Sequence, residues 1–289
     1  MIVSRAEQMG GAPHVLSIIT VVRNASAELA DTIESVRRQT YPAVEYIVVD
    51  GASTDSTMDV LRRNLPRIDR WISKPDHGIY DAMNKGKAMA SGAFAMFVNA
   101  GDTFVDNDVI TRMMSHVRGT DVLYFGKVRL VAAGGGLSWE VPIIPTLRSE
   151  PPPGYLPHHQ SIFYPRSYYI AHDYDPAMGY RADAQFTGNA CRLLPREFTN
   201  VVTIKSMLGG TSSRAIVSVK ELREEIAKET AFASHVASTT GKRAQLFDVT
   251  GSLFVKYLAS KVGGPSLVHR LMYLKHVLRS RYGAMVRDR

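Results

Sequence analysis

The residues with the clearest chemical potential stand directly after apolar segments of the chain. Asn99 and Asp102 follow the apolar residues 93–98, and the two are joined by Ala-Gly. A divalent cation such as Mg²⁺ or Mn²⁺ prefers hard oxygen ligands, usually one or two carboxylates plus substrate phosphates. Asp102, on a turn after a predicted buried strand, meets that requirement. The alternative is that Asp102 caps a helix beginning near residues 106–108.

Three further carboxylates stand at places that suit ligand binding. Asp50 closes the apolar segment 46–49, where it can accept hydrogen bonds from a base or ribose; the alternative is a turn aspartate that supports residues 53–54. Asp76 comes just before a predicted helix, whose N-terminal amides favour anionic ligands. Asp81 lies in the first turn of that helix, where a carboxylate also suits the helix dipole.

Alternating strands and helices must position these side chains. Near-continuous apolar runs predict buried strands. The predicted strands cover residues 15–22, 46–49, 68–72 and 93–98; helices are predicted between them, one capped by Ser26 and one over residues 78–90. This alternation predicts right-handed βαβ units and a parallel sheet, which binds ligands beyond the carboxyl ends of its strands. The polar residues that follow the strands are therefore expected to gather at one edge.

Composition excludes several classes of protein. The 289 residues are 45% hydrophobic and 21% charged, as in an ordinary globular chain. A single cysteine excludes an internal disulfide framework and a cysteine-rich zinc site. The apolar run 15–22 is far shorter than the ~20 residues of a membrane-spanning helix, and the first residues lack the apolar region of a secretory signal. The expected location is the cytosol.

The positive charge is concentrated at one end of the chain. Residues 241–289 carry ten basic and two acidic side chains, which accounts for the whole net charge of +8. A neutral body argues against nucleic-acid binding, whereas the basic tail indicates an anionic partner. We expect an N-terminal extension over residues 1–14, a main domain over 15–218 and a helical basic region over 219–289. The main domain would divide into a nucleotide half, about 15–130, and an acceptor half, about 131–218.

Several segments together resemble a known enzyme family. They are LSIITVVRN (16–24), SVRRQTYPAVEYIVVDGASTDST (35–57), DHGIYDAMNKGKAMASG (76–92), FVNAGD (97–102), HHQSIFYPR (158–166), YRADAQF (180–186) and GGTSS (209–213). In this order they resemble a family 2 glycosyltransferase of the bacterial surface-polysaccharide or glycolipid type. The resemblance implies an α/β GT-A fold with a mostly parallel sheet, and an inverting transfer of a sugar from a nucleotide-diphosphate donor.

The resemblance also assigns roles to residues. Asp102 matches the last aspartate of the family's metal-binding motif, in which Asn99 replaces the first, and it would hold Mn²⁺ or Mg²⁺. Asp183 matches the general base, with Gln185 in place of a second acid; the alternative is an ordinary aspartate at a helix start. The residues expected to bind the donor are Asp50, Asp76, Asp81, Asn84, Lys85 and Asn99; for Asn84 and Lys85 a solvated helix face is the alternative.

Two later segments are expected to contact the acceptor or the phosphates. In an extended chain His158 and His159 would point to opposite sides, so they would not chelate a metal together. His159 and Gln160 could contact the acceptor or donor sugar, with a structural role as the alternative. Thr211 lies in a Gly-Gly-Thr-Ser loop that could close over the pyrophosphate or be a plain turn.

The expected function is therefore transfer of a sugar to a lipid-linked or saccharide acceptor at the inner face of the cell membrane. The basic tail would dock on anionic lipid, because leucines at spacings of four, three and four share a helical face with flanking cations; these leucines would otherwise pack on the catalytic domain. The rival from another class is a non-catalytic nucleotide-sugar-binding or assembly subunit. A nucleotidyltransferase is a weaker rival, because no Gly-rich phosphate loop follows the first strand.

Overall fold

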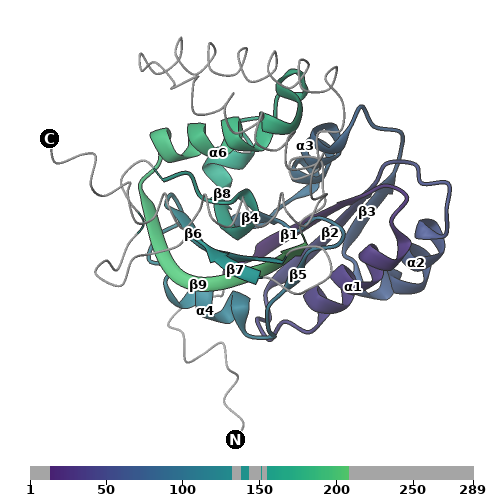
Figure 1. Ribbon diagram of the computed structural model, residues 1–289, viewed down its shortest axis with the longest axis horizontal. Coiled ribbons are helices and arrows are strands. Elements are labelled where there is room, and N and C mark those ends of the chain that lie inside the picture. The colour runs from purple at the N-terminus through teal and green to yellow at the C-terminus, as the bar shows by residue number, and fades with distance from the viewer. Residues whose placement is uncertain (1–13, 132–137, 143–150, 152–154, 208–289) are drawn as a thin grey trace, which may run out of the picture.

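The first apolar run of the chain forms a strand, β1 (Leu16–Val22), in which every residue is buried. It lies at the centre of a mixed sheet with helices on both faces (Figure 1). The computed structural model describes residues 14–131, 138–142, 151 and 155–207. Burial on both faces explains why β1 is apolar throughout, rather than alternating between apolar and polar residues.

The sheet has the order β3-β2-β1-β4-β8-β6-β9-β5, with β7 beside β6. The other strands are β2 (Val44–Asp50), β3 (Arg70–Ser73), β4 (Phe94–Phe97), β5 (Thr103–Phe104), β6 (Leu123–Val131), β7 (Ser138–Val141), β8 (Ile162–Pro165) and β9 (Arg196–Met207). Strands β3, β2, β1 and β4 are mutually parallel, as the alternation of strands and helices predicts. Beyond β4 the pairing changes: β8 runs antiparallel to both β4 and β6, and β9 runs parallel to β6.

Two apolar cores separate the sheet from its two helical layers. The helices are α1 (Ser26–Arg37), α2 (Thr57–Asn64), α3 (Ile79–Met89), α4 (Val109–Ser115), α5 (Arg166–Tyr169) and α6 (Ala182–Leu193), with 3-10 turns η2 (Leu65–Arg67), η3 (His159–Ser161) and η4 (Pro176–Arg181). Residues of α1, α2 and α4 share one core, and residues of α3, α5 and α6 share the other. The helices α3 and α6, drawn above the sheet in Figure 1, therefore cover the same face.

A glycine brings α3 close to the sheet. A Cβ atom on Gly86 would lie 2.4 Å from Cγ2 of Ile19 in β1, so only glycine allows this approach. Helix α3 carries the Gly-Ile-Tyr-Asp-Ala-Met-Asn-Lys-Gly sequence, and this close packing fixes where its first turn meets the sheet edge.

The predicted elements differ from the structure in detail. Ser26 does not cap α1: the cap position is Ala25, whose side chain makes no capping hydrogen bond. The short strand expected at 68–72 is Arg70–Ser73, because a 3-10 turn follows α2 and delays it. Within the described ranges, no helix is long and apolar enough to span a bilayer. The expected regions 1–14 and 219–289 lie almost wholly outside the described residues, and the domain boundaries stay a prediction.

Candidate functional site

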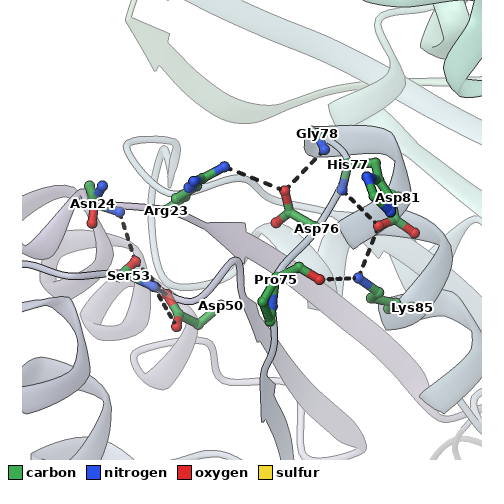
Figure 2. A network of polar contacts seen from close by, with 10 residues as sticks. All are labelled: Arg23, Asn24, Asp50, Ser53, Pro75, Asp76, His77, Gly78, Asp81 and Lys85. Atoms are coloured by element: carbon green, nitrogen blue, oxygen red, sulfur yellow. Dashed lines mark hydrogen bonds and ion pairs between the residues drawn. The ribbon is translucent and has the colours of Figure 1, made fainter.

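The polar residues that follow the parallel strands meet at one edge of the sheet. In the register of β1 and β2, Val22 lies opposite Asp50, and in that of β2 and β3, Asp50 lies opposite Ser73. Arg23 and Asn24 extend directly from β1 at this edge (Figure 2). The parallel topology thus brings together side chains that are far apart in the sequence, as predicted for the carboxyl ends of these strands.

Asp50 is fully buried beneath this edge. Its carboxylate accepts hydrogen bonds from the Ser53 amide at 3.1 Å, the Ser53 hydroxyl at 2.5 Å and the Ser73 hydroxyl at 2.6 Å. This geometry matches the alternative interpretation, a turn aspartate that supports the loop at residues 53–54. A direct contact of Asp50 with a nucleoside stays a prediction.

The same loop is tied to the end of β1. The side-chain oxygen of Asn24 accepts a hydrogen bond from the Thr54 amide at 2.8 Å, and the Asn24 amide donates to Ser53 Oγ at 2.7 Å. Asn24 has a φ of 50°, a left-handed conformation that asparagine tolerates better than most residues. The loops after β1 and β2 therefore form one rigid surface (Figure 2).

Asp76 approaches this surface from the next loop. Its side chain is 6% exposed, and one oxygen accepts from the Gly78 amide at 3.0 Å and lies 4.0 Å from the Arg23 guanidinium. A Cβ on Gly51 would lie 2.2 Å from the other oxygen. The glycine after Asp50 thus leaves the room into which the Asp76 carboxylate fits.

The first turns of α3 are held by internal contacts. Asp81 accepts from the His77 amide and from Lys85 Nζ, both at 2.9 Å, and Lys85 also donates to the Pro75 carbonyl at 2.9 Å (Figure 2). The His77 amide and Lys85 lower the pKa of Asp81 below its ordinary value. These contacts brace the loop at 75–78 from the helix, so Lys85 is not merely part of a solvated helix face.

Asn84 braces a different segment. Its amide nitrogen donates to the Tyr174 carbonyl at 2.8 Å, and its amide oxygen accepts from the Tyr174 amide at 2.9 Å. Both polar ends of Asn84 thus hold the backbone that leads to α6. The solvated helix face is wrong for Asn84 as well, and a donor contact by Asn84, Lys85 or Asp81 stays a prediction.

Asp102 lies on the turn between β4 and β5 and is only 8% exposed. Gln160 Nε2 donates a close hydrogen bond to its carboxylate, the Ser206 hydroxyl bonds it as well, and the Thr32 hydroxyl donates to its carbonyl at 2.9 Å. Burial raises the pKa of Asp102, although the bonds from Ser206 and Gln160 partly offset this. The capping alternative is wrong, because α4 begins after Asp108, well beyond the turn that holds Asp102.

Asn99 leaves an oxygen available beside Asp102. Its Oδ1 is buried and has no hydrogen-bond partner among the described residues, and its carbonyl accepts from the Asp102 amide at 3.0 Å. A buried amide oxygen and a buried carboxylate on the same turn are oxygen donors of the kind that Mg²⁺ or Mn²⁺ prefers. Within the described ranges no group of three or more acidic, histidine or cysteine side chains could hold a metal ion. The residues present therefore fit a cation that takes most of its ligands from phosphates and water.

Asp183 opens α6 on the other side of the site. Its Oδ1 accepts from the Ala184 amide at 2.8 Å, and its Oδ2 lies 3.2 Å from His159 Nδ1. Burial alone would raise the pKa of Asp183, but His159 and the Ala184 amide outweigh it, and the net pKa is lower than usual. The carboxyl is thus ionised at neutral pH while 28% of the side chain stays exposed, as a general base requires.

Consecutive residues connect the two acids. His159 contacts Asp183 and Gln160 contacts Asp102, so η3 spans the site. The expectation that the adjacent histidines point to opposite sides is wrong. The chain turns at η3, and the rings of His158 and His159 stack with centroids 5.3 Å apart. The extended-chain argument fails because a 3-10 turn, not a strand, carries His159.

Sequence reasoning missed two residues. Tyr80, in the first turn of α3, hydrogen-bonds Asp183 and stacks on Tyr174 with ring centroids 5.7 Å apart. Burial first, and then the Asp183 charge, raise the pKa of Tyr80. Arg23 presents a guanidinium, 62% exposed, at the sheet edge. The sequence signal for Arg23 was its position as a basic residue directly after the first strand. The sequence offered no signal for Tyr80 other than its place in the Gly-Ile-Tyr-Asp motif. Thr211 lies outside the described residues.

Comparison with known proteins gives a family match. The model of Glycosyl transferase family 2 matches residues 17–184. An uncharacterized glycosyltransferase of Mycobacterium tuberculosis is 39% identical over 128 residues, which are 43% of this chain and 48% of that protein. A PGL/p-HBAD biosynthesis glycosyltransferase of Mycobacterium bovis is 35% identical over 106 residues, 36% of this chain and 41% of that protein. The chain thus spans about half the length of the curated relatives it matches.

Solved structures give a match in fold. S. aureus TarS 1-349 in complex with UDP-GlcNAc has a TM-score of 0.60 at 16% identity. The match covers 86% of this chain and 73% of the TarS chain. The mannosyltransferase PcManGT of Pyrobaculum calidifontis, in complex with GDP-Man and Mn²⁺, has a TM-score of 0.55 at 15% identity. This match covers 95% of this chain and 86% of the PcManGT chain. The predicted fold class, α/β GT-A, is confirmed.

Proposed function

Because the chain belongs to glycosyltransferase family 2, we propose that it transfers a sugar from a nucleoside-diphosphate donor to an acceptor hydroxyl, with inversion at the anomeric carbon. The observation that carries this proposal is the link, through η3, between the buried Asp102 and the partly exposed Asp183. Gln160 bonds Asp102 on the turn between β4 and β5, and the adjacent His159 contacts Asp183 on α6. A site with one carboxylate for the donor and one for the acceptor suits a displacement at a carbon between them.

Asp183 is the proposed base. It takes the proton of the acceptor hydroxyl while that oxygen forms a bond to the anomeric carbon. The bond from that carbon to the phosphate oxygen breaks on the opposite face, and the electron pair leaves with the nucleoside diphosphate. The exposed part of the Asp183 side chain supports this role, and the lowered pKa means only that the carboxyl is ionised and free to accept a proton.

Asp102 and the Asn99 amide oxygen would hold the divalent cation. When bound, the cation would neutralise the charge that develops on the departing diphosphate. The neighbour PcManGT is bound to Mn²⁺ with GDP-Man, and Mn²⁺ or Mg²⁺ suits the oxygen ligands of this site. On the donor side, the exposed Arg23 guanidinium lies within reach of a phosphate at the same edge.

A donor screen tests the proposal. Thermal unfolding is followed with UDP-GlcNAc, GDP-Man and other nucleotide sugars, with and without Mn²⁺, because a ligand that binds only the folded chain raises its stability. Release of nucleoside diphosphate is then measured with and without acceptor. Binding with no release under either condition would contradict transfer and favour a non-catalytic binding subunit.

For the acceptor we propose a lipid-linked or glycolipid intermediate at the cytoplasmic face of the membrane. A relative acts in PGL/p-HBAD biosynthesis, and residues 241–289 carry ten basic side chains. Each basic residue near an anionic surface contributes about 1 kcal/mol of binding free energy, so several together suffice for docking. These residues lie outside the described part of the chain.

Co-sedimentation with vesicles tests the docking. The full chain should bind vesicles that contain phosphatidylglycerol, dissociate in high salt and lose binding when truncated after Thr240. Vesicles of phosphatidylcholine alone are the matched control. Equal binding by the truncated and full-length chains would contradict docking by the tail.

A further inference from the structure

One short turn contacts both acids of the site. Gln160 is 3% exposed and donates a close hydrogen bond to Asp102, while the Nδ1 of His159 lies 3.2 Å from Asp183. Asp102 and Asp183 belong to different halves of the fold, one after β4 and one on α6. Within the described residues, the consecutive residues His159 and Gln160 thus connect the two acids through one polar contact each.

The turn itself cannot readily move. Ser161 is fully buried, and both its amide and its hydroxyl donate to the His158 carbonyl, at 2.8 and 2.7 Å. The turn η3 packs against β4, β6, β9 and α6. Because the turn is already fixed, its side chains can hold a carboxylate in place at a small additional cost in conformational entropy.

The tautomer of His159 follows from its neighbours. A carboxylate only accepts hydrogen bonds, so the Nδ1 that faces Asp183 carries the proton. The Nε2 is buried and has no hydrogen-bond partner among the described residues. Packing alone does not explain a His159 ring whose Nε2 is buried without a partner while its Nδ1 contacts the partly exposed Asp183.

We infer that η3 is a positioning element, in which His159 orients the base Asp183 and Gln160 orients the donor-side acid Asp102, so that one turn sets the spacing between them. The inference rests on the proposed function and replaces the expected acceptor or phosphate contact of both residues. Neither side chain touches the reacting atoms; each acts through the carboxylate that it holds.

Other groups also face Asp183. Tyr80 reaches it from α3, His158 lies beside His159, and the buried Tyr164 and Tyr174 lie within range of its charge. His159 favours the ionised carboxylate by direct contact and His158 by its position nearby, and the Tyr80 hydroxyl also donates to it. Loss of the His159 donor should therefore raise the pKa of Asp183 and move the acidic limb of the pH–rate profile to higher pH.

Two substitutions at His159 separate positioning from packing. Asparagine in place of His159 keeps a donor nitrogen near the position of Nδ1, whereas glutamine in the same place carries its donor further out, near the position of Nε2. The assay is release of UDP from UDP-GlcNAc or of GDP from GDP-Man, with Mn²⁺. His159→Gln should lower the turnover by about 10²-fold, the cost of a misplaced catalytic group, and move the acidic limb to higher pH. His159→Asn should keep both close to the wild type.

Donor affinity and a distant histidine provide the controls. The dissociation constant of the donor, measured by calorimetry, should be unchanged in both His159 variants. His116→Leu, at the end of α4 in the opposite helical layer, should change neither turnover nor pH profile. Thermal unfolding of each variant shows whether it is folded.

The Gln160 half of the turn has a separate readout. Gln160→Met keeps the length of the side chain and removes the donor to Asp102. It should weaken the part of donor binding that depends on Mn²⁺, measured by calorimetry with and without the metal, and leave the acidic limb in place.

Three results would overturn the inference. The first is a folded His159→Gln variant with the turnover and pH profile of the wild type. The second is equal loss in His159→Asn and His159→Gln. The third is unchanged Mn²⁺-dependent binding in Gln160→Met. A wild-type chain that releases no nucleotide would instead overturn the proposed function, and the inference with it.

Discussion

Two groups of acids lie in the site, and they differ in how their oxygens are used. In the donor-side loops, defined as residues 23–24, 50–54 and 75–85, Asp50 and Asp81 accept hydrogen bonds from neighbouring amides, hydroxyls and a lysine. At η3, Asp102 and Asp183 are held by one turn, and nearby Asn99 Oδ1 and His159 Nε2 lie buried without partners among the described residues.

This difference distinguishes acids that stabilise the fold from polar groups that are available to a ligand. Buried polar groups in folded proteins nearly always find partners, so an acid whose partners are all local serves the fold first. A polar atom that is buried and left unpaired needs another explanation, such as a ligand. We therefore expect substitutions at η3 to reduce turnover, and substitutions in the donor-side loops to reduce stability.

The largest effect is expected at Asp102. Asp102→Asn removes the charge proposed to hold the cation and should lower turnover by about 10³-fold or more. EDTA should have the same effect on the wild type, and added Mn²⁺ should restore it. Transfer that persists in EDTA, or a fully active variant, would contradict the metal role.

The next effect is expected at Asp183. Asp183→Asn keeps the size and the hydrogen bonds of the side chain but cannot accept a proton, so turnover should fall by about 10²–10⁴-fold. Calorimetry should give an unchanged donor affinity. Loss of donor affinity with normal turnover at saturating donor would place Asp183 on the donor side instead.

In the donor-side loops a substitution should act on stability. Asp50→Ala removes the buried carboxylate that the part-buried hydroxyls of Ser53 and Ser73 bond, and it should lower the free energy of unfolding by about 1–3 kcal/mol, measured by urea denaturation. Turnover at saturating donor should change little. Wild-type stability with a collapse of donor affinity would instead support direct nucleoside binding by Asp50.

The smallest effect is expected at Asp81. Asp81→Asn weakens the contacts to Lys85 and His77 and should cost about 0.3–0.5 kcal/mol of unfolding free energy at neutral pH. Because the folded-state pKa of Asp81 is lowered, its contribution is present above the unfolded pKa and is lost as the pH falls through the folded pKa. The difference between wild type and variant, followed by urea denaturation at several pH values, should therefore vanish in acid.

Much of the first part of the fold, from β1 to the turn after β4, could be predicted from the sequence. The apolar run of β1 and the alternation with helices gave four parallel strands, and the position of Asp50, Asn99 and Asp102 after strands placed them at one edge. The cap at Ser26 failed because capping residues are common and only local geometry selects among them.

The part of the fold from β6 to β9 was less predictable. Strands β6, β8 and β9 pair with each other and with β4 in a mixed pattern, which no local signal encodes. His159 and Gln160 were found as a motif, yet their orientation was predicted for an extended chain and is set by a 3-10 turn. Whether a polar residue braces the backbone, as Asn84 does, depends on a distant segment at Tyr174.

The sequence by itself determined the fold class, the sheet edge and the candidate acids, because strand periodicity and the rule for carboxyl ends of parallel strands are local or topological. Only the tertiary structure decided which acids are saturated and which are linked. Asp102 and Asp183 meet through His159 and Gln160 because three segments, distant in the chain, pack around one buried turn. Hydrogen-bond partners and burial depend on such long-range packing, which residue types and spacing do not specify.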